Sequence, residues 1–310
     1  MNTITKNTVR LLSLFAFLLS GTFLKSQSIE KITPVFDPPG NYYLTLGAFT
    51  DTLHGWVGEP NINKIWFTVD GGYSWHIQKE IGEEKLSDIF FLDYGHGWAV
   101  SVLPTEDSSK IYYTEDGGTN WISYTAPLIY TINFVDESTG IGVGKNGIYK
   151  TTDGGITWQK KNLDFEGTLL ENQNLIMKDN YGYSIGYKID TTHSYSISYS
   201  IIKTTDYGEN WRFIYPIPGD FVKNGYFLSE NRGFFTTFGD LILVTGEQNA
   251  WEDKGTNIIG RWTDVAFFDN DNGFVVGDNG EIAFTRDSGE TWEQLSKSSN
   301  NYFSKIILVN

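Results

Sequence analysis

The segment Thr151-Thr-Asp-Gly-Gly-Ile-Thr-Trp158 decides the fold, because its pattern, Thr-x-Asp-x-Gly-x-x-Trp, recurs along the 310-residue chain. Five full copies are present, and a degenerate sixth copy ends at Trp251. The spacings between successive repeat tryptophans are 46, 37, 53, 40 and 41 residues. A period near forty residues, with short apolar segments between tight turns, is typical of a β-propeller with one four-stranded blade per repeat. We therefore expect an all-β protein with a single propeller domain, with six blades favoured and seven as the alternative.

The alternative of seven blades depends on the two ends of the chain. The last apolar segment, residues 303–309, follows no repeat of its own, and residues 29–36 have the composition to pair near it. Propellers usually close their ring by joining the two ends of the chain in one blade.

Each repeated position of this Asp box has a mechanical explanation. The aspartate can accept backbone N–H groups across its own turn. The glycine permits a positive φ, and the tryptophan is a large apolar group suited to fill the space between blades. An identical catalytic or metal site on every blade has no chemical purpose, so we interpret these residues as scaffold: Asp70, Gly72, Trp75, Asp116, Gly118, Trp121, Asp153, Gly155, Trp158, Asp206, Gly208, Trp211, Asp287, Gly289 and Trp292.

The boxes resemble the Asp-box (BNR) repeats of sialidase-type propellers. The longer unit from Asp136 to Trp158 is similar to propellers of the photosystem II stability and assembly-factor type, which are widespread among exported bacterial proteins. The resemblance covers roughly residues 44–295. It implies the propeller fold and protein partners, and it transfers no binding residue, because that group's basic recognition surface has no match in this acidic chain.

Residues 1–26 differ from the rest of the chain. Lys6 and Arg10 precede a nine-residue apolar stretch, Leu11 to Leu19, and small or polar residues follow. This order is typical of a secretory signal peptide, and the stretch is too short to span a bilayer. We predict that residues 1–26 are removed, with cleavage near Ser26 or Gln27, and that residues 27–310 form the propeller; a buried N-terminal helix is the alternative.

The chain is acidic, which excludes two classes of partner. Its net charge is −15, and residues 1–26 hold three positive charges and no negative one, which leaves −18 for residues 27–310. Nucleic acids and anionic membranes both attract basic surfaces. We predict no nucleic-acid partner and no transmembrane segment in the mature chain. Because the sequence has no cysteine, we expect neither a disulfide nor a lipid on an N-terminal cysteine.

The residues that catalysis would require are scattered. Sialidases need three converging arginines, and only four arginines lie outside the leader: Arg212, Arg232, Arg261 and Arg286. Arg212 follows a box tryptophan and Arg286 lies within a box, so the two that remain cannot form a triad. The four histidines show no metal-ligand spacing, and residues 269–273 lack the closing glutamate of a calcium loop. We interpret acidic pairs such as Glu83–Glu84 as solvated loop charges. The sequence therefore predicts no catalytic residue, no metal and no cofactor.

A binding site is expected on the face opposite the boxes. In an up-and-down blade, the turns that carry the boxes lie on one face, and the loops of variable length lie on the other. Function tends to reside in such loops on a rigid frame. Two long insertions there, residues 160–173 and 187–200, contain our candidate binding residues, which combine aromatic rings with a histidine: Phe165, His193, Tyr195 and Tyr199.

We therefore predict an exported, monomeric and non-catalytic propeller that binds a protein, a peptide or a glycan. Its location would be periplasmic, on the cell surface or secreted. One alternative is a glycan-acting hydrolase or lyase that uses a pair of carboxylates near the central channel. A second alternative is a structural module of an envelope assembly.

Overall fold

The computed structural model of the protein shows strands and no helix among the residues that it describes. In some strands, including all of those before Leu46, only the backbone is described. The described residues are 7–13, 16–21, 30–32, 35–36, 46–59, 63–102, 107–163, 168–169, 175–190, 196–217, 222–237, 241–245, 250–253, 255–258, 260–296 and 303–309. This part of the chain contains no helix with the length and apolarity that a membrane span requires.

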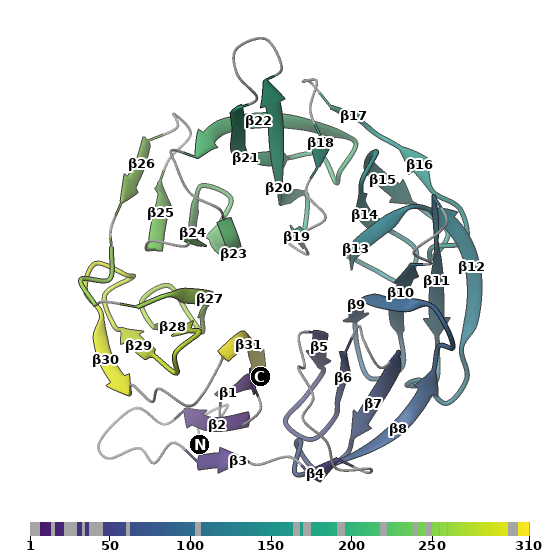
Figure 1. Ribbon diagram of the computed structural model, residues 1–310, viewed down its shortest axis with the longest axis horizontal. Coiled ribbons are helices and arrows are strands. Elements are labelled where there is room, and N and C mark those ends of the chain that lie inside the picture. Colours follow the sequence, from purple (N-terminus) through teal and green to yellow (C-terminus); the bar gives the residue numbers. More distant parts are fainter. Residues whose placement is uncertain are drawn as a thin grey trace, which may run out of the picture.

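The described strands form seven sheets arranged in a ring (Figure 1). In blades 1 to 6 the four main strands are antiparallel and come from one stretch of chain, whereas blade 7 combines strands from both ends of the chain. Blade 1 also has the short β4 (Val35–Phe36) parallel to its outer strand. Blade 1 contains β5 (Leu46–Phe49), β6 (Gly55–Glu59), β7 (Lys64–Thr68) and β8 (Ser74–Glu80); blade 2 contains β9 (Lys85–Phe91), β10 (Gly97–Val102), β11 (Ser108–Thr114) and β12 (Ile122–Pro127); blade 3 contains β13 (Ile129–Phe134), β14 (Gly140–Gly144), β15 (Gly147–Thr151) and β16 (Gln159–Lys160).

Blade 4 is the most elaborate, because two short strands join its main four. These are β17 (Asn162–Leu163) and β18 (Thr168–Leu169). Blade 4 otherwise contains β19 (Leu175–Lys178), β20 (Tyr181–Asp190), β21 (Ser196–Thr204) and β22 (Asn210–Ile217); blade 5 contains β23 (Val222–Ser229), β24 (Arg232–Thr237), β25 (Leu241–Thr245) and β26 (Ala250–Asp253); blade 6 contains β27 (Trp262–Phe267), β28 (Gly273–Gly277), β29 (Ile282–Thr285) and β30 (Glu293–Ser296).

Blade 7 corrects the favoured count of six blades. It joins β31 (Phe303–Val309) to three strands from the other end of the chain: β1 (Asn7–Ser13), β2 (Ala16–Gly21) and β3 (Glu30–Ile32). The box count favoured six because β31 carries no box, whereas the alternative of seven used residues 303–309 to close the ring. Residues 30–32 lie in the same sheet as β31 but are separated from it by β1 and β2. Strands β1 and β2 lie within residues 1–26, which the sequence predicts to be a removable leader, and that assignment stays a prediction.

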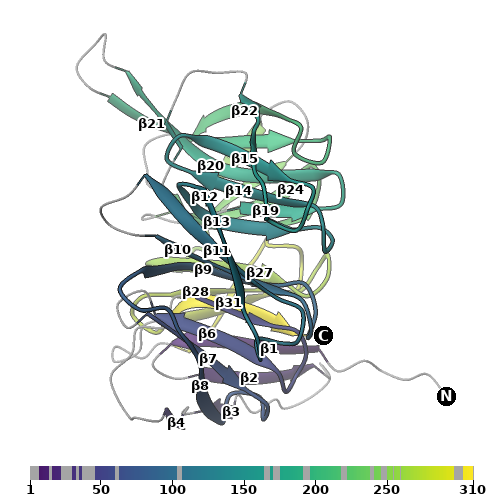
Figure 2. The ribbon, with the colours of Figure 1, turned by 90° about the vertical axis from the view of Figure 1, so that its right-hand side faces the viewer.

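The ring has two distinct faces, which are seen from the side in Figure 2. On the box face, each box turn meets the turn between the first two strands of its blade; for example, Gly154 N donates to Ser138 O at 2.9 Å. On the opposite face, which we call the loop face, the link between blades meets the turn between strands two and three. There Ile81 N donates to Asn63 O at 2.9 Å. This arrangement agrees with the two faces expected from the sequence.

Among the described residues, seven apolar clusters hold the ring together, one at each interface between neighbouring blades. Aromatic stacking recurs at these interfaces. Trp98 of blade 2 lies 3.8 Å from Phe134 of blade 3, between ring centroids, with the rings almost parallel. Trp56 stacks on Phe91 in the same way at 3.6 Å. Because each cluster combines side chains from two blades, no blade can complete its core alone.

Candidate functional site

The third Asp box shows how the box carboxylates are used. Thr151 Oγ1 donates to Asp153 Oδ1 at 2.7 Å, and Thr151 Oγ1 accepts a hydrogen bond from Gly155 N at 2.9 Å. Thr157 donates its N–H and its hydroxyl to the two oxygens of Asp153. Slight burial raises the pKa of Asp153, but the hydrogen bonds from Thr157 and Thr151 outweigh it, so the pKa lies below its usual value. The carboxylate therefore stays ionised and is occupied by its own turn.

The same hydrogen-bond pattern is present around the aspartates of the other four boxes, Asp70, Asp116, Asp206 and Asp287. Four box tryptophans also donate Nε1–H to the carbonyl of the box glycine, at 3.0 to 3.2 Å. Trp121 is the exception, because its buried Nε1 has no partner among the described residues. Trp75 and Trp211 are buried, whereas the rings of Trp121, Trp158 and Trp292 are half-buried.

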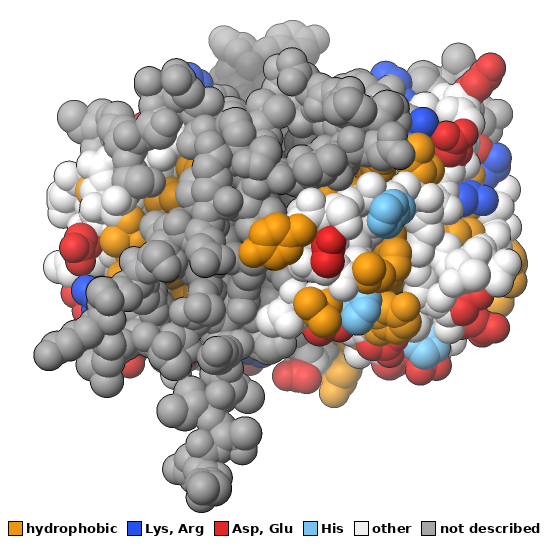
Figure 3. Space-filling view, turned by 90° about the horizontal axis from the view of Figure 1, so that it is seen from below, with side chains coloured by type: hydrophobic (Ala, Val, Ile, Leu, Met, Phe, Trp, Pro, Cys, Tyr) orange, Lys and Arg blue, Asp and Glu red, His pale blue; other side chains and the backbone are white. Residues whose placement is uncertain are grey.

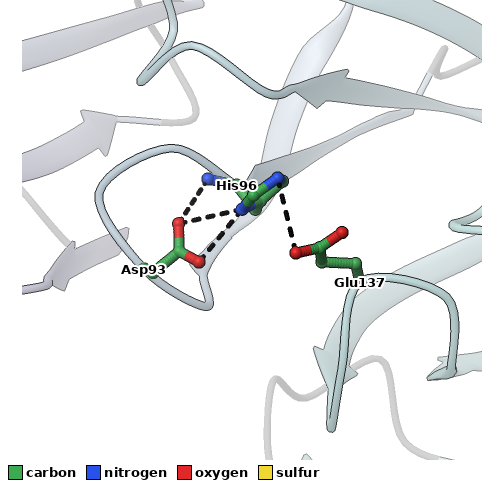
Figure 4. A group of neighbouring side chains, drawn as sticks. All are labelled: Asp93, His96 and Glu137. Atoms are coloured by element: carbon green, nitrogen blue, oxygen red, sulfur yellow. Dashed lines mark hydrogen bonds and ion pairs between the residues drawn. The ribbon is translucent and has the colours of Figure 1, made fainter.

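A histidine lies between two carboxylates on the box face of blades 2 and 3 (Figure 4). His96 Nδ1 lies 3.0 Å from both oxygens of Asp93, and His96 Nε2 lies 3.6 Å from Glu137 Oε1. The hydrogen bond to Asp93 raises the pKa of His96 despite partial burial, and the charges of Asp93, Glu137 and Glu115 act in the same direction.

The three side chains offer ligand atoms within 4.8 Å of one another. However, the imidazole ring stands between the two carboxylates, with one nitrogen facing each, which suits an ion-paired imidazolium. In blade 1, His54 Nδ1 contacts Asp51 in the same way at 2.7 Å. Because this repeated pair caps a turn, we assign it to the scaffold.

The loop face of blades 1 and 2 contains a buried carboxylate, Glu84, which is only 6% exposed. It accepts hydrogen bonds from Ser101 and Lys110, and from Tyr112 Oη at 2.9 Å. Burial raises the pKa of Glu84, but the hydrogen bonds from Lys110, Ser101 and Tyr112 outweigh it and hold this pKa below its usual value. Burial and Glu84 raise the pKa of Tyr112 to about 12. The prediction that both members of the Glu83–Glu84 pair are solvated is therefore wrong for Glu84, which fastens the link between blades 1 and 2.

Two buried aspartates on inner strands, Asp88 and Asp264, were not expected from the sequence. Asp88 Oδ2 accepts hydrogen bonds from the hydroxyl of Thr131 at 2.7 Å and from Ile132 N at 2.9 Å, both in the next blade. Burial raises the pKa of Asp88, and the opposing charge of Lys305 does not compensate.

Asp264 performs the same function between blades 5, 6 and 7. It accepts hydrogen bonds from Asn224 Nδ2 and from Ile306 N, both at 2.6 Å. Burial raises its pKa to about 7, against the hydrogen bond from Ile306 and the charge of Lys305. The sequence does contain a pattern that marks these positions. In four inner strands, a polar residue stands three places before a phenylalanine; these residues are Asp88, Thr131, Asn224 and Asp264.

The predicted binding residues cannot be placed in this geometry. Phe165, His193 and Tyr195 lie outside the described residues, and only the backbone of Tyr199 is described, in β21. The described backbone on either side forms a long hairpin, with β20 and β21 paired as far as Asp190 and Ser196. In the side view, this hairpin projects from the loop face (Figure 2).

Comparisons with known proteins agree with the repeats. The family model described as Photosynthesis system II assembly factor YCF48 matches residues 243–309, and the BNR/Asp-box repeat model matches residues 149–160. The photosystem II assembly lipoprotein Ycf48 of Synechococcus sp. (strain CC9902) is 24% identical over 262 residues, which cover 79% of this chain and 73% of that protein. This chain is an Asp-box β-propeller that resembles the photosystem II assembly factors. The resemblance inferred from the repeats is thereby confirmed.

Solved structures share the fold of this Asp-box propeller. A structure titled YCF48 bound to D1 peptide has a TM-score of 0.62 and 20% identity, and covers 86% of this chain and 93% of that chain. The GH74 enzyme of Niastella koreensis also has a TM-score of 0.62, with 12% identity, and covers 84% of this chain and 46% of that chain. At these identities, the likeness shows a common fold, which is compatible with both binding proteins and enzymes.

Proposed function

We propose that this Asp-box propeller is an exported, non-catalytic protein that binds an extended segment of a partner protein through its loop face. The observation that carries the proposal is the long β20–β21 hairpin, which projects from the loop face of a rigid ring. The names of two similar proteins, an assembly lipoprotein and a propeller bound to a peptide, support a peptide segment as the ligand.

The proposed binding residues are those that the sequence singled out around this hairpin and the preceding insertion: Phe165, His193, Tyr195 and Tyr199. Aromatic rings supply large contact areas at a low cost in side-chain entropy, and peptide recognition commonly combines such rings with backbone hydrogen bonds. Tyr199 belongs to β21, which pairs with β20 in blade 4.

Glycoside hydrolysis is not our proposal, although a GH74 enzyme shares the fold. The general acid of that reaction needs a carboxyl group with a raised pKa. Glu84, the buried carboxylate described on the loop face, has a lowered pKa and is bound to Lys110. This geometry fastens a loop and does not deliver a proton. Asp88 and Asp264 have raised pKa values, but both are buried and hydrogen-bonded to neighbouring blades, which assigns them to the scaffold.

Binding is tested with the exported protein immobilised and probed with a displayed random-peptide library and, in parallel, a glycan array. We expect enriched peptides to bind the parent and to bind Tyr195→Ala about tenfold more weakly, with unchanged melting. Tyr207→Ala is the matched control, because this exposed tyrosine lies in the box of blade 4, on the opposite face. Equal peptide affinity of parent and Tyr195→Ala, or binding of glycans alone, would contradict the proposal.

Export is tested by the intact mass of the protein recovered outside the cytoplasm. We expect a mature N-terminus near Gln27, because residues 1–26 have the order of a signal peptide. Residues 29–36 would then be available to pair near β31 in place of β1 and β2. Recovery of a full-length chain that starts at Met1 would show instead that β1 and β2 are permanent parts of blade 7.

A further inference from the structure

One corner of the box face is apolar where the fold does not require it. Nine large hydrophobic side chains are exposed among the described residues, and four of them lie in neighbouring turns of blades 1 and 2. We call this group the blade 1 corner; its members are Leu53, Val69, Tyr73 and Tyr94, which are 51%, 50%, 51% and 49% exposed. Figure 3 shows apolar side chains gathered beside histidines on the side of the ring that carries β7 and β8.

The turn chemistry does not explain these residues. The box of blade 1 is formed by Thr68, Asp70, Gly72 and Trp75, through the same hydrogen bonds as in the other boxes. Val69 and Tyr73 occupy the variable positions, where the other boxes carry mostly polar or charged residues: Glu115, Thr152, Thr205 and Arg286 at the first position, and Thr119, Ile156, Glu209 and Glu290 at the second. Exposed valine and tyrosine are therefore a property of this corner and not of the repeat.

The corner is held in a fixed shape. The ring of Tyr94 packs against His54, with ring centroids 4.7 Å apart, and lies 6.1 Å from Trp56. His54 is in turn held by Asp51, and Leu53 O accepts a hydrogen bond from Gly71 N at 2.8 Å. A surface that is ordered before binding loses little entropy when a partner arrives.

The surroundings of the corner are strongly acidic. The six turns on the box face of blades 1 to 3 contain eight acidic residues, two histidines and neither lysine nor arginine; these turns are residues 50–55, 68–75, 92–97, 114–121, 135–140 and 151–158. His96 offsets part of the charge of Asp93 and Glu137, and the balance stays negative. Despite partial burial, hydrogen bonds hold the pKa values of Asp51, Asp70 and Asp93 below their usual range, so these carboxylates stay charged at neutral pH. Exposed tyrosines beside an acidic rim fit an apolar side chain that is flanked by cations.

We propose that the blade 1 corner is a second binding surface, which docks a basic segment of a partner protein. An aliphatic or aromatic side chain of that segment would pack on Leu53, Tyr73 and Tyr94, and its lysines or arginines would lie over the acidic turns. This surface is distinct from the loop face, so the protein could hold two segments on its two faces.

The test uses three synthetic peptides and fluorescence anisotropy with the exported protein. The first peptide places leucine and tryptophan between lysines and arginines; the second replaces the leucine and tryptophan with serine; the third replaces the basic residues with glutamate. We expect the first peptide to bind, the second to bind about tenfold more weakly and the third not to bind. High salt should weaken the first complex, because its attraction is partly electrostatic.

The double variant Leu53→Ser/Tyr73→Ser should bind the first peptide about tenfold more weakly than the parent. Tyr207→Ser, at an equally exposed tyrosine in the box of blade 4, should bind the first peptide like the parent. Tyr195→Ala should also bind it like the parent, which would distinguish binding at the blade 1 corner from binding at the loop face. Equal affinity for the first two peptides would show that only the basic residues contribute to binding, and this result would overturn the proposal. Unchanged binding by the double variant, or self-association that the double variant abolishes, would overturn it as well.

Discussion

Trp98→Ala is expected to lower the free energy of unfolding by about 3–5 kcal/mol. The indole is completely buried and stacks on Phe134 of the next blade. Its Nε1 also donates to Gly154 O at 2.8 Å, in the box turn of blade 3. The alanine variant would leave a cavity between blades 2 and 3 and an unpaired carbonyl at its edge. Denaturant unfolding followed by far-ultraviolet circular dichroism measures the loss.

The matched control for this prediction is Trp121→Ala. Trp121 is half-buried, and its Nε1 has no hydrogen-bond partner in the described part of the chain. Its removal should therefore cost clearly less than removal of Trp98. Coincident unfolding curves for Trp98→Ala and the parent would mean that the interface between blades 2 and 3 does not hold the ring closed.

The sequence predicted the Asp boxes well because each box is a local structure. Threonine, aspartate, glycine and tryptophan lie within eight residues, and their hydrogen bonds span at most four positions along the chain. The repeat period then places one box on each of several blades. The fold class and the two faces of the ring follow from that local pattern alone.

The features that the repeats do not mark are all non-local. Blade 7 pairs β31 with β1, from opposite ends of the chain, and no repeat marks it. Glu84 looked like a solvated acid because its partner Lys110 is 26 positions away. Asp264 accepts its hydrogen bond from Ile306 across 42 positions. The sequence shows the spacing of such residues, but only the closed ring shows that their carboxylates are buried.

A second large effect is expected in the pH dependence of stability, through Asp264. Its pKa is raised by burial from 3.8 to about 7 in the folded protein. Between pH values of about 4 and 7, the folded chain therefore keeps a proton that the unfolded chain has released. The free energy of unfolding should fall as the pH rises through this window and then level off. The pKa difference corresponds to an upper bound on the order of 4 kcal/mol.

Asp264→Asn isolates this contribution, because asparagine cannot titrate and has nearly the same shape. The variant loses one accepted hydrogen bond, from Asn224 or Ile306, so its absolute stability differs from that of the parent. The informative quantity is the slope: chemical unfolding at a series of pH values should give a flatter profile for Asp264→Asn than for the parent. Other groups, including His96 and Asp88, titrate in both proteins, so their contributions to the pH dependence of stability cancel when the two profiles are compared. Parallel profiles would show that Asp264 is ionised throughout the window, held in that state by Asn224, Ile306 and the charge of Lys305.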